Sequence, residues 1–156
     1  MDKILGQDEL EIGKGYIKEK NYKEAVHYLR KAFLLYQDNP NQIPGAILSY
    51  YGVAIAYGEK NFTEGIVFCK KALNRKDLAP EFYLYAAELL IRNRQKKDAF
   101  KILEEGLGKF KGHPKIKAKL EEFGVRKRPP IPVLKRSHPV NKVLGKIMRE
   151  SITSKK

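Results

Sequence analysis

The chain has 156 residues, enough for one domain with extensions whose core needs neither disulfides nor metal ions. Its single cysteine, Cys69, excludes an intrachain disulfide, and no apolar run approaches the roughly 18 residues that a membrane-spanning helix requires. The formal net charge of +14 is unevenly distributed, because residues 125–156 hold ten Lys or Arg against one Glu. Any partner bound by charge is therefore expected at that tail.

The sequence of the N-terminal part predicts a helix from about residue 4 or 7 to residue 20. Its apolar residues have the spacing of one buried helix side: Leu10, Ile12, Tyr16 and Ile17. Residues 1–9 are acidic and have no uninterrupted apolar stretch, so they do not form a secretory signal. We therefore expect a cytoplasmic protein without a transmembrane segment.

A second helix is predicted to begin after Asn21, because Asn21 and Glu24 have the spacing of a capping box. The same device recurs before two later helices, as Asn61 with Glu64 and as Gln95 with Asp98. Residues 37–44 then form a turn by composition, with Pro44 in the first position of the next helix.

The predicted helix over residues 45–59 is nearly uncharged, which indicates that it is buried or meets a partner. A third helix pair is expected at residues 80–93 and 95–110. Pro114 then opens a short helix to residue 123, whose polar outer side suits the end of a helical array.

Small residues recur along these predicted helices at fixed distances. Gly65 and Ala72 are seven apart, as are Ala99 and Gly106, and Gly65 lies 34 residues before Ala99. Residues seven apart share one side of a helix, where small side chains allow a second helix to approach closely. The interval from Ala25 to Gly65 is six residues longer, and we place the excess in the loop 37–44 and in the turn near residue 58.

A 34-residue period of helix pairs resembles the tetratricopeptide repeat family. The matching residues are Gly13, Tyr16, Tyr22, Ala25, Leu29 and Ala32 in the first copy, Gly52, Phe62, Gly65 and Ala72 in the second, and Ala87, Ala99, Leu103 and Gly106 in the third. The resemblance implies an all-α fold, a right-handed α-solenoid with repeats at about residues 6–40, 45–78 and 80–113 and a capping helix at 114–123. The alternative is an ordinary helical bundle.

Residues 125–156 form a basic, Pro-rich tail with a different composition. Four prolines between residues 126 and 139 favour an extended course, and Asn141 caps a predicted amphipathic helix to residue 151. The helix has one apolar side: Val140, Val143, Leu144, Ile147 and Met148. This stretch resembles the tail that follows tetratricopeptide repeats in some bacterial proteins.

The predicted tail helix is too short to be stable alone, so it must dock. Three docking sites are possible. The first is the groove or last repeat of its own chain, the second is another protein or a second copy in a homodimer, and the third is an anionic membrane surface as a peripheral contact.

Catalysis is not expected. The three histidines, His27, His113 and His138, have neither metal-ligand nor triad spacing, and no Gly-rich phosphate loop occurs. Cys69 lies on the apolar side of a predicted helix, where a buried structural thiol is expected. We therefore predict no enzyme, no cofactor and no metal site.

The family resemblance implies that the first helix of each pair lines a concave groove. The groove positions carried over are Leu10, Lys14, Ile17, Lys18, Tyr50, Ala54, Tyr57, Leu84, Tyr85, Glu88, Ile91 and Arg92. Chaperone-binding members clamp a carboxylate there with Lys, Asn and Arg, but here Leu10, Lys14, Glu81 and Tyr85 stand at those positions. The resemblance thus implies an apolar or amphipathic protein segment as partner, and some of the tyrosines are also candidates for the core.

Two functions follow. The first is a non-enzymatic scaffold or adaptor that binds a protein or peptide in this groove, with the C-terminal helix as a self-occupant. The second is a nucleic-acid or ribosome-associated protein that binds phosphates through tail cations, although the tail has no aromatic residue for base stacking. The candidate cations are Arg126, Lys127, Arg128, Lys135 and Arg136.

Overall fold

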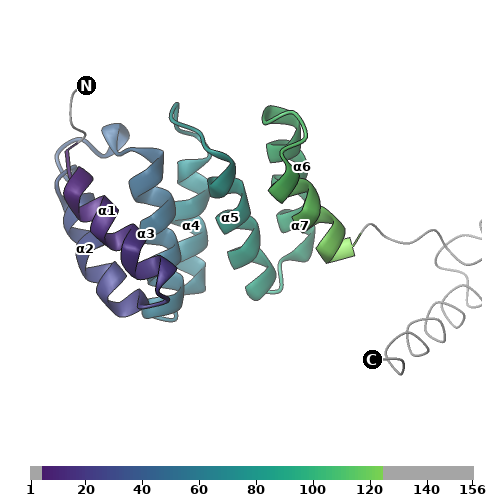
Figure 1. Ribbon diagram of the computed structural model, residues 1–156. Helices are drawn as coiled ribbons and strands as arrows, with labels where there is room; N and C mark the ends of the chain where they lie inside the picture. The colour runs from purple at the N-terminus through teal and green to yellow at the C-terminus, as the bar shows by residue number, and fades with distance from the viewer. Residues whose placement is uncertain (1–4, 125–156) are drawn as a thin grey trace, which may run out of the picture. The chain divides into compact units, whose positions relative to one another are not determined.

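The computed structural model describes residues 5–124, and all regular structure in that range is helical (Figure 1). The helices are α1 (Gln7–Lys18), α2 (Tyr22–Leu34), the short 3-10 helix η1 (Pro40–Gln42), α3 (Gly45–Gly58), α4 (Phe62–Ala72), α5 (Pro80–Arg92), α6 (Lys96–Lys109) and α7 (Pro114–Gly124). The predicted all-α class is confirmed for this range. The chain divides into two compact units, residues 1–120 and 121–156.

The predicted helix ends agree with the structure to within two residues, with one local correction. Pro44 is the residue before α3 rather than its first helical residue, with φ −59° and ψ 144°. The preceding turn also contains η1, which was not predicted. Pro80, by contrast, does occupy the first position of α5.

Within each of the three helix pairs, the two helices are joined by a turn of the same length: residues 19–21, 59–61 and 93–95. The middle residue of each turn has a left-handed backbone: Lys20 and Lys60 have φ 60° and Arg94 has φ 62°. The prediction that part of the six-residue excess between Ala25 and Gly65 lies in the turn near residue 58 is therefore wrong. The ten-residue connection 35–44, compared with seven residues at 73–79, takes up part of the excess.

Glycines mark the sites where paired helices come closest. A Cβ atom at Gly52 of α3 would lie 2.6 Å from the carbonyl oxygen of Gly65 on α4, and one at Gly65 would lie 2.5 Å from that of Gly52. In the third pair, a Cβ at Gly106 would lie 2.7 Å from the ring of Tyr83. The prediction that small residues allow close helix approach is confirmed at these positions.

One of the predicted capping boxes is present in the structure and the other two are not. The Asn61 side chain accepts a hydrogen bond from the Glu64 backbone N–H at 3.2 Å, and its amide donates to the Glu64 carboxylate at 2.7 Å. Asn21 and Gln95 occupy the equivalent positions before α2 and α6 but make no side-chain capping bond. The capping box is therefore confirmed at Asn61 and wrong at the other two.

The N-terminus of α3 is capped from the next connection. The Asp77 carboxylate accepts from the backbone N–H of Gly45 at 3.0 Å and of Ala46 at 3.4 Å. Two residues earlier, the Arg75 guanidinium donates to the carbonyl oxygens of Asn41 at 2.7 Å and Pro40 at 2.9 Å. The two connections, 35–44 and 73–79, are thus tied together.

Helix α3 lies at the centre of the packing, as its uncharged sequence predicts, and most of its residues are buried. Helix α1 contacts α3, and α3 contacts α5, in addition to the contacts between consecutive helices (Figure 1). Among the described residues, α2, α4 and α6 make no comparable contacts with one another. The helices α1, α3 and α5, called the odd row below, therefore lie closer together than the even-numbered helices.

A membrane-spanning helix was not expected from the sequence. Within residues 5–124, none of the helices combines the length and the apolar character needed to cross a bilayer.

Candidate functional site

A hollow of about 240 Å³ opens on the odd row, and we call it the tyrosine pocket. Its lining comes from four helices and one turn: Ile17, Lys18, Lys20, Tyr22, Val53, Tyr57, Tyr85, Glu88 and Leu89. Val53 and Leu89 are buried and form an apolar floor, whereas the tyrosines are only partly buried and form the walls. The pocket exists because α1, α3 and α5 lie side by side.

Tyr57 is the best-anchored wall of the pocket. Its hydroxyl donates a 2.7 Å hydrogen bond to Glu88 Oε1 on α5, and its ring stacks on Tyr22 with 4.8 Å between centroids. Burial, together with the hydrogen bond to Glu88, raises the pKa of Tyr57 well above its usual 10.0. Tyr57 therefore stays a neutral hydrogen-bond donor at any physiological pH.

A second aromatic group lies beside the pocket on the same row. The Tyr50 ring packs edge-on against Tyr85 at 5.4 Å, and the Lys14 ammonium lies 5.2 Å from the Tyr50 centroid. Lys14 also pairs with Glu11 at 2.8 Å. Burial raises the pKa of both Tyr50 and Tyr85, so these rings too present neutral, partly exposed faces.

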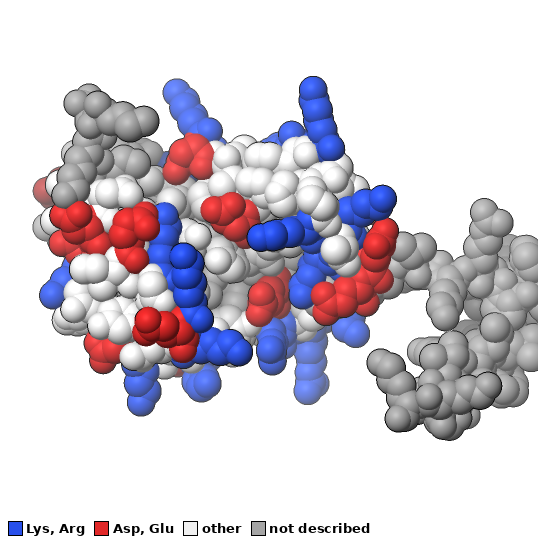
Figure 2. Space-filling model, in the orientation of Figure 1, with Lys and Arg blue, Asp and Glu red and all other residues white. Residues whose placement is uncertain are grey.

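The charge around the pocket is mainly positive. Lys18 and Lys20 are exposed and line its rim, and the Arg92 guanidinium lies 6.0 Å from the Tyr57 ring. Glu88 is the acidic residue in the lining, and within residues 5–124 no Lys or Arg forms an ion pair with it. Figure 2 shows positively charged side chains following the side of α1 that faces α3, and the adjoining surface carries both uncharged residues and Asp or Glu side chains.

The predicted groove residues fall into four groups in the structure. Ile17, Tyr57, Tyr85 and Glu88, with Lys18, line the tyrosine pocket. Lys14 and Tyr50 lie next to it, and Leu84 and Ile91 are partly buried residues packed against the core. Leu10 and Ala54 are 2% and 0% exposed, so the structure places them in the core rather than on a binding surface.

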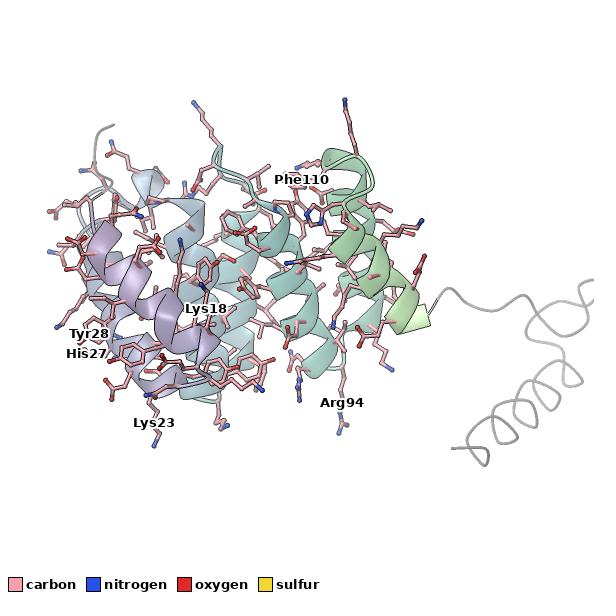
Figure 3. The ribbon with its side chains drawn as sticks, viewed as in Figure 1. Lys18, Lys23, His27, Tyr28, Arg94 and Phe110 are labelled. Atoms are coloured by element: carbon pink, nitrogen blue, oxygen red, sulfur yellow. The ribbon has the colours of Figure 1, made fainter. Side chains whose placement is uncertain are left out.

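Four lining residues were missed from the sequence: Lys20, Tyr22, Val53 and Leu89. The sequence identifies Tyr22 only as a repeat residue, and its position as the first residue of α2 does not reveal that its ring meets Tyr57 of α3. Figure 3 shows Lys18 on α1 beside α3, and His27 and Tyr28 on α2; the Tyr28 ring stacks on Tyr16 of α1 with 5.5 Å between centroids and does not line the pocket. Tyr28 is therefore an aromatic residue of the same chain outside the pocket.

The predicted tail sites lie outside the described residues. This applies to the apolar docking set, Val140, Val143, Leu144, Ile147 and Met148, and to the cations Arg126, Lys127, Arg128, Lys135 and Arg136. Cys69, by contrast, is described: it is fully buried, its thiol donates to the Ser49 carbonyl at 3.5 Å, and burial raises its pKa to about 12.

The comparisons with known proteins add no family or relative, since neither the protein-family models nor the curated proteins gave a match to this chain. The chemistry available in the pocket consists of aromatic faces, one carboxylate and a cationic rim. Such a set favours recognition of another molecule through contact area and charge.

Proposed function

We propose that this chain is a tetratricopeptide-like helical array that works as a non-enzymatic scaffold or adaptor. It binds an apolar or amphipathic segment of a protein partner along the odd row. The tyrosine pocket is the observation that carries this proposal, because it offers open volume with an apolar floor between rings that are already held in place. Tyrosine supplies a large contact area at low entropic cost, which suits peptide recognition.

Two features of the fold support a repeating array. The three turns within the pairs have the same length and the same left-handed middle residue, which indicates three copies of one hairpin. The odd row is more closely packed than the even-numbered helices, and unequal packing of this kind curves an array toward its closer side. The odd row would then be the hollow side, where solenoid proteins bind their partners.

A peptide selection tests this function directly. A library of random 12-residue peptides displayed on phage is selected on the immobilised full chain, and selected peptides are synthesised and titrated. We expect amphipathic sequences whose affinity falls at least about tenfold in the double variant Tyr57→Ala/Tyr85→Ala, since central aromatic residues dominate such contacts.

The control for that experiment is Tyr28→Ala, which removes a partly buried ring of α2 that stacks on Tyr16 of α1 and does not line the pocket (Figure 3). It should leave the affinity of the selected peptides unchanged. The opposite pattern, with binding kept in the double variant and lost in Tyr28→Ala, would place the binding surface outside the tyrosine pocket and refute the proposal.

Binding of nucleic acid through the tail is the second candidate, and the +9 charge of residues 125–156 favours it. Neutralising several phosphates makes affinity fall steeply with salt concentration. A steep salt dependence of RNA or DNA binding, abolished by removing residues 125–156, would support this candidate. Peptide binding in the pocket should persist in the truncated chain.

A further inference from the structure

From the charges and volume of the tyrosine pocket we infer that the partner segment is acidic and carries one large apolar or aromatic side chain that fills the pocket. This inference rests on the proposed function and specifies the partner's chemistry.

The size of the pocket sets the size of the anchor. An apolar cavity of about 150 Å³ is enough to hold benzene. The 240 Å³ hollow therefore admits one aromatic ring or a large aliphatic side chain, and the floor of Val53 and Leu89 removes such a group from water. Two tyrosine walls, Tyr57 and Tyr85, come from neighbouring helices and present rings for offset or edge-on contact.

The charges around the pocket determine what surrounds the anchor. Lys18 and Lys20 on the rim and Arg92 beside Tyr57 carry three positive charges. The negative charges near the pocket are those of Glu88 in the lining and of Glu81, which acts electrostatically on Tyr85. One carboxylate oxygen of Glu88 already accepts the Tyr57 hydroxyl at 2.7 Å. Lys14 adds little to this imbalance because Glu11 pairs with it.

A cationic rim around an apolar floor discriminates between partners. Acidic residues next to the anchor would face Lys18 and Lys20, whereas basic residues there would meet like charges, which costs affinity and slows association. The hydrophobic anchor supplies the contact area, and the rim selects the sign of the partner's charge.

The test uses three seven-residue peptides, labelled with fluorescein and blocked at both ends so that no terminal carboxylate contributes. One has a central Phe flanked by Glu and Asp, the second replaces that Phe with Ala, and the third flanks Phe with Lys and Arg. Fluorescence anisotropy with the full chain should show the acidic Phe peptide binding at least about tenfold more tightly than either of the others.

Charge reversal then locates the interaction. The variant Lys18→Glu/Lys20→Glu should weaken the acidic Phe peptide by about tenfold or more and reduce its preference over the basic Phe peptide. The matched control is Lys23→Glu, an exposed lysine in the first turn of α2 outside the pocket lining, which should have little effect.

Failure of this inference and failure of the proposed function give different results. Tighter binding of the basic Phe peptide, or equal binding of the Phe and Ala peptides, overturns the inference. It leaves the scaffold proposal intact if selected peptides still require Tyr57 and Tyr85. If selected peptides bind without those tyrosines, both fail.

Discussion

A methyl group added at Gly52 or Gly65 would collide with the backbone of the facing helix, since each Cβ would lie within 2.6 Å of a carbonyl oxygen. Gly52→Ala and Gly65→Ala should each lower the free energy of unfolding by about 1–3 kcal/mol, although alanine is the better helix former. Urea denaturation measures the change.

The matched control is Gly15→Ala, because Gly15 is also helical but has no atom within 4 Å of its added Cβ. This variant should be up to about 1 kcal/mol more stable than the wild type. If the Gly52→Ala variant were also more stable than the wild type, α3 and α4 would not approach each other as closely as described.

Arg94 has a backbone conformation that L-residues other than glycine adopt at a cost, with φ 62° in the turn after α5. Arg94→Gly should therefore raise the free energy of unfolding by about 1 kcal/mol. Lys101→Gly, at an exposed interior position of α6, should instead lower it by about 0.5–1 kcal/mol. Loss of stability in both variants would argue against the left-handed turn.

Because of the buried Cys69 thiol, the free energy of unfolding depends on pH in the alkaline range. The folded thiol keeps its proton to about pH 12, whereas the unfolded thiol ionises near its usual 9.0, so its contribution is present below pH 9 and is lost as the pH rises. The cost of Cys69→Ala, measured by urea unfolding, should therefore be smaller at pH 10.5 than at pH 8. A cost that does not change with pH would mean that the thiol is not buried as described.

At the scale of elements, Asp77 holds the start of α3 from a connection 32 residues further on. Asp77→Ala should lower the free energy of unfolding by about 0.5–2 kcal/mol, as the loss of an N-cap does, and Asp77→Asn should lower it less because an acceptor oxygen remains. Asp38→Ala, which changes another exposed acidic residue in a connection, should stay within about 0.5 kcal/mol of the wild type. Equal effects of Asp77→Ala and Asp38→Ala would exclude the cap.

The helices could be predicted from the sequence because their signals are local. Apolar spacing, the proline at position 80 and the seven-residue recurrence of small residues all act within one helix or one pair. The cap from Asp77 could not be predicted, since it joins positions far apart in the chain. The left-handed turns could not be predicted either, because lysine and arginine do not indicate that backbone conformation as glycine does.

At the scale of the whole molecule, the candidate site was only partly predictable. Helical spacing indicates which side of a helix is apolar, but it does not tell which positions on that side a third helix covers. Leu10 and Ala54 are thus core residues, while Ile17 and Tyr57 line the pocket. Tyr22 belongs to an even-numbered helix, and its ring lines the pocket and stacks on Tyr57 of α3.

Amide chemical shifts show at residue level whether the odd row is the surface that binds a protein segment. The ¹⁵N-labelled full chain is titrated with a peptide selected on it, and shift changes are mapped onto the helices. We predict that the largest changes fall in α1, α3 and α5 around the tyrosine pocket. Changes concentrated in α2, α4 and α6, or confined to residues 125–156, would refute binding along the odd row.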